Sequence, residues 1–193
     1  MQFTVLTASL ALASTALGVT IPKAPRSIED YNQGIMALNG TIHGIPWVGT
    51  GTIEQIYAEF TKAYPDAAAK DKRDPKPKTI TDLFCIPIAG QDWTKARTQY
   101  INDGIDYLNT VDAFCNCGGQ SCVRISCSWN SAIYLCNDND DEIWNACDYM
   151  ATFAQDIVDQ CTTTYPPPVW TTRSGGQEFD SNNFNIIVRD DSC

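Results

Sequence analysis

The chain has 193 residues, 44% of them hydrophobic, so it can bury one core but is too short for two well-packed domains. It carries 13 Lys and Arg against 23 Asp and Glu, and the net charge of -10 argues against a nucleic-acid partner. Nine cysteines beside one histidine are typical of an exported, disulfide-bonded protein and unusual for a cytosolic enzyme.

The N-terminal residues have the pattern of a secretory signal peptide. The apolar run 5–17 ends beside the small residues Ala16 and Gly18, which suits signal peptidase, and it is too short to span a bilayer. We expect residues 1–18 to be a signal peptide that ends at Gly18. No later run reaches the ~18 uninterrupted apolar residues of a membrane helix, so the sequence predicts a secreted protein without a stable membrane span.

Residues 19–73 contain no cysteine and close in a polar linker that is flanked by prolines. The pair Lys72-Arg73 in this linker resembles the dibasic site that kexin-type proteases cut in the fungal secretory pathway. We expect residues 19–73 to be a prosegment that is removed by cleavage after Arg73. A charged linker that is never cut is the alternative.

Two further features lie in this expected prosegment. Asn39 begins the chain's only N-glycosylation sequon, so we expect a glycosylated precursor. The apolar spacing over 55–69 predicts a short helix, at least up to Pro65.

Cleavage after Arg73 leaves residues 74–193 as the mature domain, which holds all nine cysteines but not His43, the only histidine. Ser-His-Asp, Cys-His and paired-histidine ribonuclease mechanisms need an imidazole that titrates near neutral pH. A histidine-ligated zinc or copper site is excluded for the same reason. We therefore expect a non-enzymatic protein with no cofactor and no metal. A hydrolase that uses paired carboxylates, as in glycoside hydrolysis, is the enzymatic alternative.

The apolar patterns of the mature domain alternate between strands and two helices. In chain order they predict a strand over 79–89, a helix from Asp92 to Leu108, a tight loop over 115–122, strands over 123–128 and 132–136 joined by a turn, a helix over 141–161, a loop over 162–176 and a last strand over 184–189. Pro87 places the first strand at the edge or end of a sheet. Asp92 is the expected cap of the first helix, and Asp140 or Asp141 that of the second.

The order strand, helix, strand, strand, helix, strand predicts an α+β fold. A four-stranded antiparallel sheet with two helices on one face, the split βαβ arrangement β-α-β-β-α-β, satisfies this order. The second face of the sheet would be exposed or covered by the loop 162–176.

All nine cysteines are candidates for the disulfides that staple this fold: Cys85, Cys115, Cys117, Cys122, Cys127, Cys136, Cys147, Cys161 and Cys193. The spacing of Cys147 and Cys161 returns both to nearly the same side of the predicted helix. We expect both to face the sheet and to bridge to a strand or to the 115–122 loop. Because nine is odd, one thiol either stays free and buried or joins two chains in a disulfide-linked dimer. A zinc site of four thiolates is the other use that the count allows.

The acidic run 137–142 invites a calcium site. An EF-hand loop that starts at Asp138 would require glycine at position 143, where the chain has Ile143. Helix capping and surface charge explain these acids more simply.

Four aromatic side chains, Trp129, Tyr134, Trp144 and Trp170, could line a binding groove, and packing in the core or at its rim is the alternative. We take Trp129, Tyr134 and Trp170, together with Arg173, as the candidate partner-binding residues.

The chain resembles the fungal small secreted cysteine-rich proteins. The signal peptide, the prosegment ending in Lys72-Arg73, the stretch from Cys122 to Asp138 and the Gly-Gln-containing end 176–193 carry this resemblance. The strand–helix–strand end on a terminal cysteine is also similar to the killer toxins of smut fungi and their effector-like relatives. That likeness implies a killer-toxin-like sandwich over about residues 79–193, in proteins that act on the membranes or channels of target cells.

The resemblance implies a secreted fungal effector or virulence protein. We expect it to bind a host component without enzymatic activity and to modulate host immunity or cell viability, outside cells or after uptake into a host cell. The alternative on the same architecture is a killer-type antifungal toxin that acts on a competitor's membrane or channel. The negative charge weakens direct insertion into anionic membranes, so in both cases the partner is an unidentified host or competitor protein.

Overall fold

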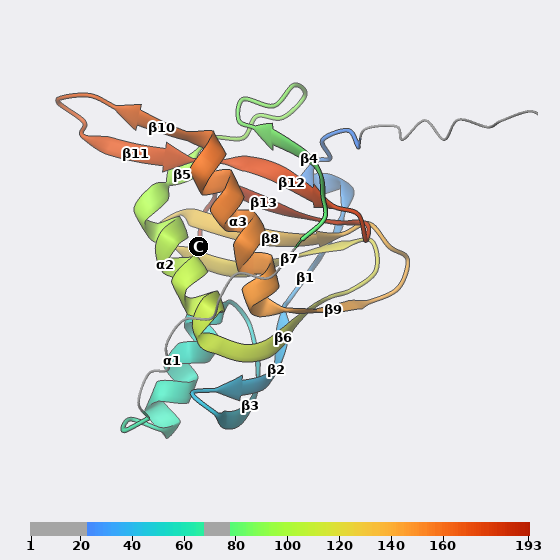
Figure 1. The fold of residues 1–193 in the computed structure, drawn as a ribbon, viewed down its shortest axis with the longest axis vertical. Coiled ribbons are helices and arrows are strands. Elements are labelled where there is room, and N and C mark those ends of the chain that lie inside the picture. The colour runs from blue at the N-terminus through green and yellow to red at the C-terminus, as the bar shows by residue number, and fades with distance from the viewer. Residues whose placement is uncertain (1–22, 68–77) are drawn as a thin grey trace, which may run out of the picture.

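The computed structural model describes residues 23–67 and 78–193, and Figure 1 shows its ribbon. The expected signal peptide and the expected cleavage site at Lys72-Arg73 lie outside these residues. The described elements are, in chain order, η1 Ile28–Asp30, β1 Asn32–Gly34, β2 Ala37–Ile42, β3 Ile45–Thr50, α1 Ile53–Ala63, β4 Ile80–Cys85, β5 Ala96–Arg97, α2 Thr98–Thr110, β6 Val111–Cys117, β7 Ser121–Ser128, β8 Ser131–Asn137, β9 Ile143–Ala146, α3 Cys147–Cys161, β10 Thr162–Tyr165, β11 Thr171–Ser174, β12 Gly176–Asp180 and β13 Phe184–Asp190.

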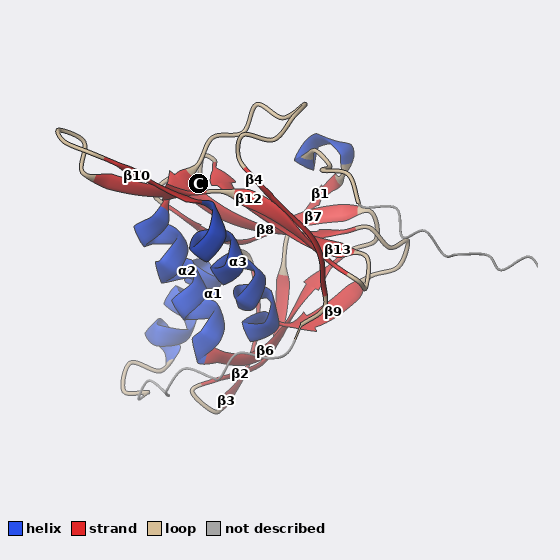
Figure 2. Cartoon of the chain, turned by 45° about the horizontal axis from the view of Figure 1, so that its top comes forward, coloured by secondary structure: helices blue, strands red, loops and turns tan. Residues whose placement is uncertain are grey.

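The strands form three sheets. The largest has six strands in the order β1-β7-β8-β13-β12-β4, the second has four in the order β3-β2-β6-β9, and the third has three in the order β10-β11-β5. The pairing of β1 with β7 is parallel, and the others are antiparallel. The α+β class is confirmed. The single four-stranded sheet with two helices is wrong, because the described chain forms three sheets and three α-helices, which gather on one side of the strands (Figure 2).

Much of the additional structure comes from the segment that the sequence predicts to be a prosegment. Its strand β2 pairs with β6, its strand β1 pairs with β7, and α1 contacts α2. Helix α1 confirms the helix that the spacing over 55–69 predicts, and it ends before Pro65. Its apolar stripe, Ile53, Ile56 and Phe60, is fully buried. Residues 23–67 therefore share one folded body with residues 78–193.

Helix α2 begins later than its sequence pattern predicts, at Thr98 instead of after Asp92. The residues before it leave the helix because β5 pairs with β11 and because Trp93 is buried in an apolar cluster on the other sheet face. Gly104 lies inside α2 where a Cβ atom would come within 2.1 Å of the Ser126 Oγ atom on β7. The glycine that weakens the helix signal thus permits the close approach of α2 to the sheet.

Helix α3 is also shorter than predicted. It runs over Cys147–Cys161, and the residues Ile143–Ala146 before it form β9, which pairs with β6. The predicted caps Asp140 and Asp141 are therefore wrong, because they precede a strand and not the helix. The apolar periodicity itself is confirmed, since Met150, Ala154, Ile157, Val158 and Cys161 are all buried.

The predicted loop 162–176 is the largest error within residues 78–193. Most of it forms the antiparallel hairpin of β10 and β11, and Gly176 already belongs to β12. Five threonines, at 162–164 and 171–172, lie in these two strands, and β-branched side chains suit extended backbone. The expected loop 115–122 is likewise shorter, because β6 runs to Cys117 and β7 begins at Ser121.

The predicted strands over 123–128, 132–136 and 184–189 are confirmed as β7, β8 and β13. The strand over 79–89 is confirmed in part, because β4 ends at Cys85 and residues 86–89 form a loop. Strand β4 is an edge strand, as Pro87 predicts. The turn between β7 and β8 is confirmed too. Its residues Trp129 and Asn130 have φ values of 49° and 57°, which fits the tight two-residue turn of a hairpin.

Four disulfides staple the described chain: Cys85–Cys161, Cys115–Cys147, Cys122–Cys136 and Cys127–Cys193. The prediction for the two helix cysteines is confirmed, because Cys147 bridges to β6 and Cys161 bridges to the end of β4. The last bridge ties the C-terminal residue to β7.

Cys117 is the unpaired cysteine, and it is buried. Its Sγ atom lies 3.1 Å from the Ser121 carbonyl oxygen and 3.5 Å from that of Leu135. Burial raises the pKa of this thiol to about 12, so it stays protonated and inert at neutral pH. Of the two alternatives for the ninth cysteine, the structure shows the free and buried thiol, and Cys117 is not accessible for a disulfide to a second chain.

Two apolar clusters lie on the two faces of the large sheet. The main cluster contains the buried side chains of the helices. The second contains Ile28 and Tyr31 from the N-terminal segment, together with Ile86, Ile88 and Trp93 from the loop after β4. The second face is therefore covered by these two segments, and not exposed or covered by residues 162–176 as the sequence predicts. Within the described ranges, no helix is long and apolar enough to cross a bilayer.

The contact at Gly104 gives a first prediction. Gly104→Ala would normally stabilise a helix by about 1 kcal/mol, but here the new methyl group collides with the fully buried Ser126. We expect a net loss of about 1–3 kcal/mol of unfolding free energy from the overpacking, measured by urea denaturation with the disulfides intact.

Gly118→Ala is the matched control, because its nearest neighbour would be 3.4 Å away. It is expected to change stability by less than about 0.5 kcal/mol. A stabilised Gly104→Ala protein would contradict the close packing of α2 against β7.

Candidate functional site: an aromatic and basic platform at the β10–β11 hairpin

The β10–β11 hairpin projects from the body of the protein, at the upper left of Figure 1. Its base is held by two hydroxyl contacts of the buried Ser174, at 2.6 Å to Thr162 Oγ1 and 2.8 Å to Thr98 Oγ1. Its end is open, with Val169 62% and Trp170 77% exposed. The disulfide Cys85–Cys161 fixes the residue directly before β10, so a rigid base presents an apolar tip.

Two arginines lie opposite each other where the hairpin joins the body. Arg173 on β11 is the cross-strand partner of Arg97 on β5. Direct partners in an antiparallel pair project on the same face, and like charges placed in this way destabilise the sheet. Arg173 is partly neutralised by Asp190 at 3.6 Å and donates to the Lys95 carbonyl oxygen at 2.9 Å. In the described chain Arg97 is exposed and forms no ion pair, so an anionic group from outside would relieve the repulsion.

Aromatic side chains extend this basic pair across the surface. Trp129 is 72% exposed at the β7–β8 turn, and its ring stacks on that of Tyr100 with the centroids 5.8 Å apart. Tyr100 and Arg97 line a hollow of about 380 Å³ together with the hairpin residues Trp170 and Arg173. We call these five residues, Arg97, Tyr100, Trp129, Trp170 and Arg173, the hairpin platform.

A second hollow also borders the hairpin, and it shares Val169, Thr171 and Arg173 with the first. A cavity of about 550 Å³ has apolar walls from Pro87, Trp93 and Val169, with Arg173 and Lys95 among the polar residues at its surface. The Lys95 ammonium donates to the Cys161 carbonyl oxygen at 2.6 Å, and partial burial lowers its pKa. The hairpin therefore borders two hollows, each with a basic residue beside apolar ones.

Three of the four residues that the sequence proposes for partner binding come together here, namely Trp129, Trp170 and Arg173. Tyr134 lies elsewhere: it is buried, and its hydroxyl donates to Asp191 Oδ2 at 2.5 Å and accepts from Arg124 Nε at 3.1 Å. Burial, followed by the Asp191 contact, raises the pKa of Tyr134 to about 12.

The sequence reasoning misses Arg97 and Tyr100. No local signal marks them, because Ala96 is the only apolar residue between Lys95 and Thr98 and the strand β5 has just 2 residues. Two of the remaining expected sites are also placed. Trp144 is 43% exposed and donates to Glu142, and Asn39 is exposed on β2, where a glycan could be attached.

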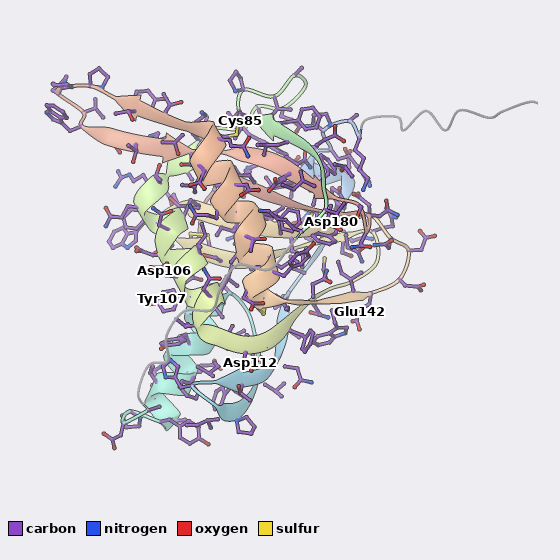
Figure 3. The ribbon with its side chains drawn as sticks, in the orientation of Figure 1. Cys85, Asp106, Tyr107, Asp112, Glu142 and Asp180 are labelled. Atoms are coloured by element: carbon purple, nitrogen blue, oxygen red, sulfur yellow. A yellow bond between two sulfur atoms is a disulfide. The ribbon has the colours of Figure 1, made fainter. Side chains whose placement is uncertain are left out.

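A hollow of the opposite charge lies between α1 and α2. It measures about 680 Å³ and is lined by Glu54, Asp103 and Asp106 with two tyrosines. Figure 3 shows Asp106 and Tyr107 on α2, well away from the hairpin. Glu54 is already engaged, because it accepts hydrogen bonds from Ser126 Oγ and from the Cys127 backbone.

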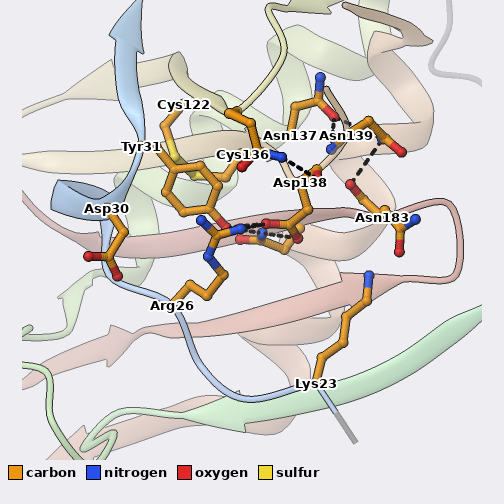
Figure 4. A network of polar contacts seen from close by, with 12 residues as sticks. Lys23, Arg26, Asp30, Tyr31, Cys122, Cys136, Asn137, Asp138, Asn139 and Asn183 are labelled. Atoms are coloured by element: carbon orange, nitrogen blue, oxygen red, sulfur yellow. Dashed lines mark hydrogen bonds and ion pairs between the residues drawn. A yellow bond between two sulfur atoms is a disulfide. The ribbon is translucent and has the colours of Figure 1, made fainter. Parts of the chain in front are cut away.

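One carboxylate of the acidic run that invites calcium is engaged within the fold, whereas Asp140, Asp141 and Glu142 are exposed. Asp138 accepts from the Arg26 guanidinium at 2.5 Å and from the Tyr31 hydroxyl at 2.6 Å, as Figure 4 shows. Across residues 23–67 and 78–193, no group of three or more His, Cys, Asp or Glu side chains could hold a metal ion.

Glu178 is the first candidate for the general acid of a carboxylate-based hydrolase, because its pKa is raised. Its side chain is fully buried, and within the described chain neither oxygen has a hydrogen-bond partner. Burial raises its pKa to about 8; Lys78 lowers the value, and Asp156 raises it. Lys78 itself is paired with Asp156 at 2.6 Å. A bulky substrate cannot reach Glu178, although its pKa would suit a general acid.

The buried Glu178 predicts a pH-dependent stability. In the folded protein the pKa of Glu178 is about 8, above its ordinary value of 4.5, so the fold favours the protonated carboxyl group. The contribution of this group to the free energy of unfolding is therefore fully present below about pH 4.5 and is lost as the pH rises through about 8. Glu178→Gln should remove this dependence. Relative to the variant, the parent protein should lose on the order of a few kcal/mol between pH 5 and pH 9.

Urea midpoints at pH 5, 7 and 9 provide the measurement. Glu142→Gln is the control, because Glu142 is exposed and the substitution removes the same charge. Parallel pH profiles of the parent and Glu178→Gln proteins would show that Glu178 does not carry the effect.

We compared the chain with protein-family models, with curated proteins and with solved structures, and none of the three comparisons gave a significant match.

Proposed function

We propose that the protein is a secreted, cysteine-rich fungal effector that binds a host component through the hairpin platform, without enzymatic activity, and so modulates host immunity or cell viability. The observation that carries the proposal is the facing pair Arg97 and Arg173 beside exposed indoles. Such a pair is unfavourable for the isolated fold. A partner that supplies an anionic group would turn this cost into binding energy.

The composition of the platform supports a role in protein binding. Tryptophan, tyrosine and arginine provide most of the energy at protein interfaces because they bury large surfaces and form several polar contacts at once. The five platform residues are of these three types, and Gln99, Val169, Thr171 and Thr172 complete the lining of the hollow beside them. Trp129 and Trp170 are mostly exposed, so they contribute little to the core, and their contact surface is available to a partner.

The disulfides support the secreted setting. Four bridges persist in oxidising compartments and are rare in the cytosol. The bridge Cys85–Cys161 also holds the base of the hairpin, and binding sites on rigid supports lose less conformational entropy when a partner binds.

A killer-type antifungal toxin that acts on a competitor's membrane or channel is the second candidate. The observation that favours it is the apolar tip of the hairpin, where Val169 and Trp170 are open to contact with a channel or a membrane surface. The charge of -10 disfavours binding to anionic lipid, so a protein channel would be its target.

Both candidates are tested with one set of variants. Trp170→Ser and Arg97→Ser should each raise the dose of purified protein needed for half-maximal activity by at least about tenfold, which corresponds to about 1.4 kcal/mol of lost binding energy. The assays are immune suppression or cell death in infiltrated leaf tissue, and growth inhibition of sensitive fungi.

Trp144→Ser is the matched control, because Trp144 is also partly exposed but lies on β9, outside the hairpin platform. Unchanged thermal melting of all three variants shows that the fold is intact. Activity in leaf tissue favours the effector, and activity on fungi alone favours the toxin. Full activity of both platform variants would refute a role for the hairpin platform.

A further inference from the structure

Residues 23–67, which we call the N-terminal piece, extend a sheet of residues 78–193, which we call the C-terminal piece. Strand β2 pairs with β6 from Leu38 opposite Cys115 to Ile42 opposite Val111. A Cβ atom on Gly40 would lie 2.3 Å from the Asp112 carbonyl oxygen. The two backbones therefore approach more closely than any side chain at this position would permit.

The N-terminal piece also completes both apolar clusters. Six of its side chains are fully buried in the main cluster: Met36, Leu38, Ile42, Ile53, Ile56 and Phe60. They share that cluster with Leu108 and Ile125 of the C-terminal piece, and on the other sheet face Ile28 and Tyr31 pack with Trp93. If the N-terminal piece left, a large apolar surface would meet water on both faces of the sheet.

Polar contacts join the two pieces as well (Figure 4). The fully buried Gln177 accepts from the Arg26 backbone N–H at 3.1 Å and donates to the Arg26 carbonyl oxygen at 3.2 Å. The fully buried Asn185 donates to the Tyr31 hydroxyl at 3.0 Å. With the Arg26–Asp138 ion pair, these bonds satisfy buried polar atoms of the C-terminal piece, which would lose their partners if the N-terminal piece left.

None of this attachment is covalent apart from the chain itself. All four disulfides join residues between Cys85 and Cys193, and residues 23–67 contain no cysteine. The disulfides therefore hold the C-terminal piece together, whereas hydrophobic burial, strand pairing and hydrogen bonds hold the N-terminal piece.

We propose that the two pieces form a stable non-covalent complex, so that cutting the chain between residues 67 and 78 produces a two-chain protein and does not release the C-terminal piece alone. The N-terminal piece is the partner that covers the apolar sheet faces of the C-terminal piece. Cleavage after Arg73, which the sequence predicts, would leave the expected prosegment bound as a subunit. This proposal does not depend on the function of the hairpin platform.

The test uses the full chain with residues 70–73 replaced by the recognition sequence of a sequence-specific protease. After cutting, a non-reducing denaturing gel should show two pieces, while size exclusion should show one species with the retention of the uncut protein. Tenfold dilution should lower the urea midpoint of the cut protein and leave that of the uncut protein unchanged, because only the cut form unfolds with dissociation.

Arg26→Ala should lower the urea midpoint of the cut protein further, because it removes the ion pair to Asp138. Lys62→Ala, an exposed substitution at the end of α1 that removes the same charge, is the control and should leave that midpoint unchanged. Separate elution of the two pieces, precipitation of the cut protein, or a midpoint that does not depend on concentration would overturn the proposal.

Discussion

The rest of the structure depends on one N-terminal segment that completes the cover of both apolar sheet faces. The hydrogen-bond ladder between β2 and β6 brings Met36 and Leu38 under the helices, while the residues before β1 cross to the opposite face and place Tyr31 there. The helices α2 and α3 could not cover these surfaces alone, because each presents only one apolar stripe. The disulfides constrain the C-terminal part, but burial of apolar area is what stabilises the N-terminal part.

The fold was predictable from the sequence where a long element carries its own periodicity. The stripe of α3 is confirmed, because the helix buries a continuous face and its residue types follow that face. Strand β7 forms where it is predicted, but both of its faces are partly buried and its register shifts between Arg124 and Ser126. Strands β5 and β9 were not predictable in the same way, since they have 2 and 4 residues and exist because β11 and β6 lie beside them. Such short strands are determined by tertiary pairing and not by local preference.

The same limit applies to the hairpin platform. Trp170 and Arg173 could be proposed from residue type, and the structure places them together with Trp129. Tyr134 shows why residue type is insufficient: its position on β8 is buried on both sides, and an aromatic ring suits such a position equally well. Arg97 and Arg173 lie opposite each other because of the register between two strands that are far apart in the sequence. No local sequence pattern encodes this pairing.

The burial of Cys117 has a practical consequence for following how the protein folds. This thiol lies two positions from Cys115 on β6, and its neighbours Ser121 and Leu135 belong to β7 and β8. It is shielded only when all three strands have assembled. A thiol-alkylating reagent added during oxidative refolding should therefore label incompletely assembled chains at this cysteine and spare finished ones. The chain thus carries a natural chemical reporter of its own maturation.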